Sequence, residues 1–189
     1  MSVVVQRRPF SIEDFARMVD VGILGKDERV ELIGGEVRQM LPIGSLHAAI
    51  VNRLNALLTE RLVHRAIVSV QNPVVLTDFT EPLPDLVVLR LRDDYYRKAL
   101  PRASDVILLI EVADTTLEYD RDDKVPKYAR MGIPEVWLVD ANGQEVTQYS
   151  RPDASSYHDV RTFGLGRELQ SVEIQPLNLS VDDIFLRGC

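Results

Sequence analysis

Cysteine is almost missing from this sequence, because the one cysteine among 189 residues, Cys189, stands at the last position. A single thiol closes no disulfide within the chain, which excludes the small secreted domains that disulfides hold together. Apolar runs are also short, and none approaches the ~20 residues of a membrane helix. The opening segment MSVVVQRRPF carries its arginines after its apolar residues, the reverse of a secretory signal. We therefore expect a cytoplasmic protein.

Positive charge is in deficit as well. The chain has 22 lysine and arginine residues against 29 aspartate and glutamate residues, a formal net charge of −7 at pH 7. That balance excludes a protein that coats nucleic acid by bulk attraction. It leaves open an enzyme that grips nucleic acid at one site, because a metal ion and a few basic side chains supply positive charge locally.

Apolar patterns predict helices and strands in a definite order. A Gly-Gly pair between two short alternating runs predicts a hairpin, and runs rich in Val, Leu and Ile predict strands covered on both faces. The expected elements are a helix at 11–20, a hairpin around Gly34-Gly35, a helix from Ser45 to about His64, strands at 67–76, 86–91 and 106–112, a helix at 120–131, strands at 135–140 and 145–149, and a short helix after Ser180. This order predicts an α/β (α+β) fold with a mixed central sheet flanked by helices.

Two carboxylates interrupt otherwise apolar strands. Asp85 opens the strand in PLPDLVVLR, and Glu111 lies near the end of the strand in VILLIEVADTT. If these strands are antiparallel neighbours, the start of one lies beside the end of the other, so the two acids are adjacent. Two close carboxylates in a dry site need a compensating cation, and Mg²⁺ is the obvious hard ion. Taken singly, each acid has a plainer reading: a turn residue after Pro84, or a solvated strand end or arginine partner for Glu111.

Three further side chains could join such a site. Lys124 and Tyr128 lie four residues apart, on one face of the expected helix, and Lys124 could reach the acids if the helix turns back over the sheet. The plainer alternative is a surface ion pair between Asp120 and Lys124. His47 lies on the apolar face of the long helix near its start, where an imidazole can meet a phosphate or a carboxylate. A core histidine with ordinary partners is the alternative there.

The sequence also resembles a known family along most of its length, from about Arg29 to Tyr149. The segments that carry the resemblance, in their expected order, are VELIGGEV, PLPDLVVLR, VILLIEVADTT and EYDRDDKVPKYARMGIPEVWLVD. They are similar to the Uma-two family of restriction-endonuclease-like proteins, catalogued as a domain of unknown function, which looks like a branch of the PD-(D/E)XK nuclease superfamily. The resemblance implies a single nuclease-like domain over residues 1–189, with a core of about 29–149 in the order αβββαβ, an N-terminal helix at 11–20 and a C-terminal extension at 150–189.

The resemblance also implies roles for individual residues. Asp85 resembles the metal-binding aspartate of the PD dipeptide, and Glu111 the (D/E) of (D/E)XK. The orthodox lysine would fall at position 113, where this chain has Ala113. The family's usual replacement is a lysine on the following helix, which Lys124 matches. The remaining matches are Tyr128, His47 and a possible additional acid, Glu31, for which a cross-strand pair with Arg38 is the alternative.

The implied activity is metal-dependent hydrolysis of phosphodiester bonds by an endonuclease. Asp85, Glu111 and the backbone carbonyl of Val112 would hold Mg²⁺, for which Mn²⁺ could substitute. Lys124 would position the attacking water or neutralise charge, and His47 and Tyr128 would orient the phosphate or assist the ligands. The expected partners are nucleic acid, DNA first, and a second copy of the chain in a homodimer, with the N-terminal segment and the hairpin 137–149 as its face. A catalytically idle nuclease-fold module that binds nucleic acid or regulates another protein is the alternative, favoured by Ala113 and the acidic charge.

Overall fold

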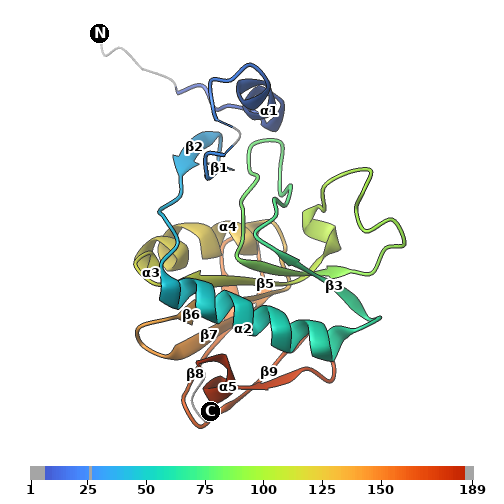
Figure 1. The fold of residues 1–189 in the computed structure, drawn as a ribbon, viewed down its shortest axis with the longest axis vertical. Helices are drawn as coiled ribbons and strands as arrows, with labels where there is room; N and C mark the ends of the chain where they lie inside the picture. Colours follow the sequence, from blue (N-terminus) through green and yellow to red (C-terminus); the bar gives the residue numbers. More distant parts are fainter. Residues whose placement is uncertain (1–6, 26, 186–189) are drawn as a thin grey trace.

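The computed structural model describes residues 7–25 and 27–185, and it has one central sheet with helices on both sides (Figure 1). The helices are α1 (Ile12–Asp20), α2 (Ser45–Leu62), α3 (Leu117–Tyr119), α4 (Val125–Arg130) and α5 (Val181–Ile184), with a 3-10 turn at Ala103–Asp105 and a π-helical turn at Asp120–Lys124. The strands are β1 (Val30–Ile33), β2 (Glu36–Gln39), β3 (Ala66–Val70), β4 (Leu86–Arg90), β5 (Val106–Ala113), β6 (Glu135–Asp140), β7 (Glu145–Pro152), β8 (Tyr157–Gly164), β9 (Glu168–Gln170) and β10 (Asn178–Ser180).

The central sheet is mixed, as the sequence predicted. Its six strands run in the order β3-β4-β5-β6-β7-β8, and β5 pairs with β6 in parallel while the other neighbours are antiparallel. The parallel pair exists because the chain crosses over through α3, the π-helical turn and α4 between β5 and β6. Two small sheets, β1–β2 and β9–β10, stand apart from it.

Each face of the sheet has its own hydrophobic core. On one face, α2 buries Leu54, Leu58 and Leu62 against alternate residues of β4, β5 and β6, and the C-terminal segment completes this layer. On the other face, α4 packs Tyr128 and Ala129 against the intervening strand residues. Because β4 and β5 are covered on both sides, their runs of Val, Leu and Ile carry no polar alternation.

The N-terminal part folds as predicted. Ser11 caps α1 by accepting the Asp14 N–H, while the Asp14 carboxylate accepts the Ser11 N–H, a reciprocal capping box. The Gly34-Gly35 turn joins β1 to β2, and both glycines have positive φ. Figure 1 shows α1 and this hairpin together at one end of the molecule, above the start of α2.

Three expectations about the elements were wrong in part. The strand expected at 67–76 ends at Val70, because Gln71 adopts a left-handed conformation with a φ of 50° and Asn72-Pro73 follows. The helix expected at 120–131 starts earlier, at α3, and contains the π-helical turn. Strands β8, β9 and β10 were not predicted, and β8 extends the central sheet beyond residue 149.

The segment 137–149, expected as part of a dimer face, lies inside the central sheet. Its strands β6 and β7 are interior strands, and β8 covers the outer edge of β7. Trp137 is fully buried and donates its indole N–H to Glu135 at 2.7 Å. This hairpin therefore offers no open strand edge. Among the helices in residues 7–25 and 27–185, none has the length and apolar character to cross a bilayer.

Candidate active site

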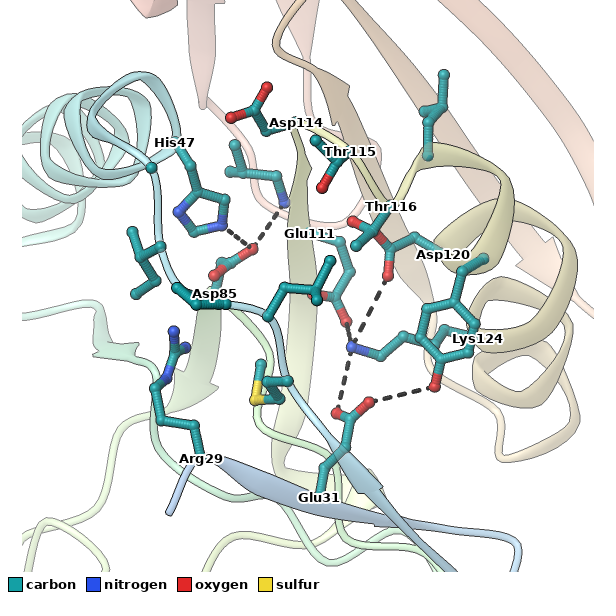
Figure 2. A pocket seen from close by; sticks show the side chains of 18 of the residues that line it. Arg29, Glu31, His47, Asp85, Glu111, Asp114, Thr115, Thr116, Asp120 and Lys124 are labelled. Carbon is teal, nitrogen blue, oxygen red and sulfur yellow. Dashed lines mark hydrogen bonds and ion pairs between the residues drawn. The ribbon is translucent and has the colours of Figure 1, made fainter. Parts of the chain in front are cut away.

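A pocket of about 760 Å³ lies at one end of the central sheet. Its walls are the start of α2, the end of β5, the helical segment 117–124, and the β1–β2 hairpin with the chain that follows it. Figure 2 shows side chains from all four converging on its floor, with Asp85 and Glu111 at the centre, His47 on one side and Lys124 on the other. A volume of this size is typical of a site for a small ligand.

The register of β4 and β5 places the two predicted acids side by side. The strands are antiparallel and Leu86 pairs with Ile110, so Asp85, one residue before β4, stands opposite Glu111. In an antiparallel pair, opposite residues project from the same face of the sheet. The two acids are 6% and 3% exposed, and the negative charge of Asp85 contributes to raising the pKa of Glu111. The adjacency expected from the strand order is therefore present in the structure.

Asp85 is held by three donors. Its Oδ2 accepts the Val112 backbone N–H at 2.9 Å and lies 3.0 Å from His47 Nε2, and its Oδ1 accepts the Gln71 amide at 3.2 Å. Burial favours the neutral acid, but the hydrogen bond and charge of His47, with the other two donors, outweigh it and lower the pKa of Asp85. Asp85 is therefore an ionised carboxylate at neutral pH, as a metal ligand must be.

His47 enters the pocket from the first turn of α2. Its hydrogen bond to Asp85 raises the pKa of the imidazole, while burial and the nearby Arg29 guanidinium act in the opposite direction. Nδ1 of His47 is buried without a hydrogen-bond partner among the described residues. The contact thus runs through Nε2, which donates its proton to the Asp85 carboxylate. Among the described residues, the polar partner of the His47 ring is Asp85, an acid of the pocket, so His47 is not simply a core histidine.

Glu111 accepts a hydrogen bond from Tyr128 and forms an ion pair with Lys124. The Tyr128 hydroxyl donates to Glu111 Oε1 at 2.5 Å, and Lys124 Nζ lies 2.9 Å from the same oxygen. Burial raises the pKa of Glu111 to about 8, and the lysine only partly offsets this effect because Asp120 and Asp85 add negative charge nearby. Burial also raises the pKa of Tyr128 well above its usual value, so the phenol stays protonated as a donor.

Lys124 is enclosed by carboxylates. Besides Glu111, its Nζ lies 3.3 Å from Glu31 Oε2 and 3.9 Å from Asp120 Oδ1, and the residue is only 3% exposed. Burial disfavours the ammonium ion, but the three acids together outweigh burial and raise the pKa of Lys124. The surface pair between Asp120 and Lys124 that helix spacing suggested is therefore not what the structure has. Lys124 is a buried cation at the end of the pocket.

The β1–β2 hairpin is fastened over this cluster by its charged side chains. Glu31 faces Lys124 and accepts the Tyr119 hydroxyl at 3.3 Å, while Arg38 donates to Tyr119 at 2.7 Å and to Asp123 at 2.5 Å. Arg38 is the cross-strand neighbour of Glu31 by register, but its guanidinium turns away to these other partners. The additional acid predicted at Glu31 thus lies in the pocket and is bound to Lys124 and not to Arg38.

Sequence reasoning missed two residues of this pocket. Asp120 is 5% exposed and accepts the Thr116 hydroxyl at 2.5 Å, and burial raises the pKa of its carboxyl. The π-helical turn, which helix spacing does not reveal, directs it inward. Arg29 lines the pocket from the segment before β1, and only its position ahead of the hairpin hinted at it.

The oxygen atoms that Asp85, Glu111 and the Val112 carbonyl offer are the kind of ligand that a hard divalent cation takes. Both contacts to Glu111 use Oε1, so within the part of the chain that the structure describes no side chain occupies Oε2. The buried surplus of carboxylates, which raises the pKa of Glu111, is the charge pattern that a cation relieves. Within residues 7–25 and 27–185, no group of three or more His, Cys, Asp or Glu side chains is placed to hold a metal ion. Two acids with the Val112 carbonyl suit Mg²⁺, which takes few protein ligands and completes its shell with water and phosphate.

The comparisons with known proteins agree with this geometry at the level of family and fold. A family model described as "Putative restriction endonuclease", Uma2, matches residues 12–183. Among curated proteins, none matches the sequence significantly.

The solved structures that are similar to this one include the following two. A crystal structure described as a "putative nuclease belonging to DUF820" from Anabaena variabilis ATCC 29413 superposes with a TM-score of 0.70 at 18% identity, covering 95% of this chain and 99% of that one. At this identity the likeness shows a shared fold. The type IIG restriction endonuclease BpuSI matches with a TM-score of 0.43 at 14% identity, covering 78% of this chain and 17% of that one.

Proposed function

This chain belongs to the Uma2 family of restriction-endonuclease-like proteins, whose model matches residues 12–183. From that premise we propose that it is a metal-dependent endonuclease that hydrolyses phosphodiester bonds in DNA. The observation that carries the proposal is the convergence of Asp85 and Glu111 from antiparallel neighbours β4 and β5, with Lys124 at 2.9 Å from Glu111. This arrangement supplies metal ligands and a cation in one buried pocket.

The residues divide the work of hydrolysis between them. Asp85, Glu111 and the Val112 carbonyl would hold Mg²⁺. A bound divalent ion supplies a water of lowered pKa and offsets charge on the phosphate. His47 keeps Asp85 ionised and oriented through the 3.0 Å contact, and Tyr128 fixes Glu111 from the other side. Lys124 stabilises the negative charge that develops on the phosphate oxygens or orients the attacking water.

A nuclease assay with purified protein tests this proposal. Supercoiled plasmid and labelled oligonucleotides are incubated with Mg²⁺, with Mn²⁺, and with EDTA. We expect cleavage with either metal and none with EDTA. Asp85→Asn, which keeps the side-chain volume and loses the charge, should lower the rate at least about 100-fold. The matched control is Asp93→Asn, a change at an exposed acid outside the pocket, which should cleave as the wild type does.

A catalytically idle module is the second candidate, and two observations favour it. Ala113 occupies the position of the orthodox lysine, and the Lys124 ammonium already neutralises part of the acid cluster. An idle module would bind nucleic acid with an affinity that neither Mg²⁺ nor Asp85→Asn alters, and no product would form in either metal. The cleavage assay and a binding titration of the same samples therefore separate the two functions.

We also propose a homodimer, since the cleavage of both strands of a duplex often uses two sites related by a two-fold axis. The hairpin 137–149 lies within the sheet. We therefore take the N-terminal segment as the contact face of the dimer. Light scattering at micromolar protein concentration tests this proposal, and a monomeric mass would contradict it.

A further inference from the structure

The pocket contains a basic side chain, Arg29, that has no part in the proposed hydrolysis. Three basic side chains line the pocket, Lys124, Arg38 and Arg29, and they differ in how many partners they have. Lys124 contacts three acids, and Arg38 contacts Asp123 and Tyr119. For Arg29, no hydrogen bond or ion pair joins its guanidinium to any side chain among residues 7–25 and 27–185. A guanidinium whose donors find no partner among the described residues is suited to bind an anion.

Arg29 points to the side of the pocket away from Lys124. Figure 2 shows its guanidinium rising from the segment before β1 toward the side where Asp85 and His47 lie. Its charge is close enough to act on the His47 imidazole. The pocket thus has an ammonium at one end, a guanidinium that pairs with no described side chain at the other, and the two acids between them. A strand of nucleic acid has a phosphate at every nucleotide, so neighbouring phosphates could meet both ends.

The wall beside Arg29 is apolar. Residues 40–43, Met-Leu-Pro-Ile, line the pocket between the hairpin and α2. Leu41 is 60% exposed and Ile43 is 39% exposed, so both side chains are accessible at the pocket. Apolar side chains of this kind pack against the faces of bases that have left a stack.

The reactive groups of the pocket are deeply buried. Asp85, Glu111 and Lys124 are each at least 94% buried, because their exposed fractions are 6%, 3% and 3%. A pocket of about 760 Å³ is on the scale of a small-molecule site. The phosphates of a duplex lie on its outside, so the preference for an unpaired strand comes from the apolar wall, which packs against bases that have left the stack.

We propose that Arg29 and the apolar segment 40–43 form a subsite for an unpaired nucleic-acid strand, with Arg29 on a backbone phosphate and Leu41 and Ile43 against the bases. This inference rests on the proposed nuclease function and adds its substrate class. The strand occupies the pocket as single-stranded nucleic acid or as a locally unpaired segment of a duplex.

Fluorescence anisotropy tests the subsite without hydrolysis. A fluorescein-labelled 12-nucleotide single strand and the corresponding blunt duplex are titrated with protein in Ca²⁺, and electrophoresis checks that the strands stay intact. We expect the single strand to bind at least about tenfold more tightly than the duplex. Equal affinity for the two, within a factor of about two, would overturn the proposal.

Variants at Arg29 locate the contact. Arg29→Ala should weaken single-strand binding about tenfold and lower the salt slope, d log K/d log [salt], by about 0.7 in magnitude, the value for one phosphate on a single strand. Arg29→Lys should keep the slope and lose part of the affinity, since an ammonium keeps the charge without the fork. The matched control is Arg97→Ala, an exposed arginine outside the pocket. If Arg29→Ala and Arg97→Ala change affinity and slope equally, the subsite is not where we place it.

Cleavage data distinguish a failure of the subsite from a failure of the enzyme. If single strands bind through Arg29 but no Mg²⁺ or Mn²⁺ product forms, the subsite stands and the nuclease proposal falls. If duplex and single strand are cut at equal rates and Arg29→Ala cuts both like the wild type, the nuclease stands and the subsite falls. Circular dichroism of each variant, compared with Arg29→Lys, ensures that a loss of binding is read from folded protein.

Discussion

Lys124 Nζ lies 2.9 Å from Glu111 Oε1, although the lysine belongs to a helical turn and the glutamate to a buried strand. In the orthodox nuclease motif, both groups share one strand, two residues apart, and this chain has Ala113 at the second position. The helix that crosses over from β5 to β6 brings the ammonium back to the strand. A lysine charge therefore lies beside Glu111, although the lysine stands 13 residues later in the sequence instead of two.

Replacing Lys124 should affect both rate and stability. Lys124→Met fills a similar volume but leaves Glu31, Glu111 and Asp120 without their shared cation, which should lower the free energy of unfolding by about 3–5 kcal/mol. We expect hydrolysis to fall about 100-fold or more. Urea denaturation and single-turnover cleavage measure the two effects. The control is Lys127→Met, in the following helix α4 and paired with Asp123 where both side chains are partly exposed, which should change stability less, by about 1 kcal/mol.

The stability of the metal-free protein should depend on pH through Glu111. Its pKa is raised from 4.5 to about 8 in the folded state, so the protonated form favours folding. This contribution is fully present below about pH 4.5 and is lost as pH rises through about 8. Wild-type protein in EDTA should therefore lose stability over this range relative to Glu111→Gln, by an amount on the order of a few kcal/mol.

Thermal or urea unfolding of both proteins at several pH values measures this difference. Adding Mg²⁺ at pH 9 should restore stability to the wild type and not to Glu111→Gln, because the cation replaces the proton on the buried acid. Parallel pH profiles for the two proteins would mean that Glu111 keeps an ordinary pKa.

His47 should act through Asp85. His47→Ala removes the 3.0 Å contact to Asp85 Oδ2 and the charge that lowers the pKa of this carboxyl. Metal affinity and cleavage should each fall about 10–100-fold, as for other side chains that orient a ligand, and higher metal concentration should recover part of the rate. His47→Gln, which can still donate, should lose less. His64→Ala, at an exposed histidine after α2, should match the wild type in the same metal titration.

The two glycines of the hairpin form a matched pair. Gly34 and Gly35 both have positive φ, 62° and 79°, but a Cβ on Gly34 would meet nothing within 4 Å, while one on Gly35 would lie 2.3 Å from Pro9 Cβ. Gly34→Ala should cost about 1–2 kcal/mol for its backbone alone, and Gly35→Ala clearly more, because Pro9 must move. Equal unfolding free energies for the two variants would contradict this prediction, because they would mean that Pro9 moves aside at no cost in stability.

The sequence predicted the elements whose patterns come from burial. Apart from Arg90 and Glu111, strands β4 and β5 are apolar because both faces are covered, and α2 shows its buried stripe at helical spacing. Strand β8 was missed because it is the edge of the sheet. Most of its side chains are exposed or half-buried, so it lacks the apolar run that marks an interior strand.

The candidate site was predictable where chemistry and strand order agree. Asp85 and Glu111 stood out as acids in apolar strands, and the order of elements placed them together. Asp120 and Arg29 did not stand out. Asp120 lies in a π-helical turn, and the spacing of residues does not predict such a turn. Whether Arg29 has a partner depends on the contacts of its neighbours in the folded chain, which residue spacing does not predict either.

The π-helical turn at Asp120–Lys124 has a consequence for how this pocket could be gained or lost in evolution. Such a turn usually accommodates one residue more than regular α-helix does. Deleting one residue between β5 and Lys124 would rotate Lys124 by ~100° about the helix axis relative to β5, with every side chain of the pocket still in the sequence. A single-codon deletion could thus take the lysine away from Glu111 without replacing any residue, and the reverse insertion could bring it back.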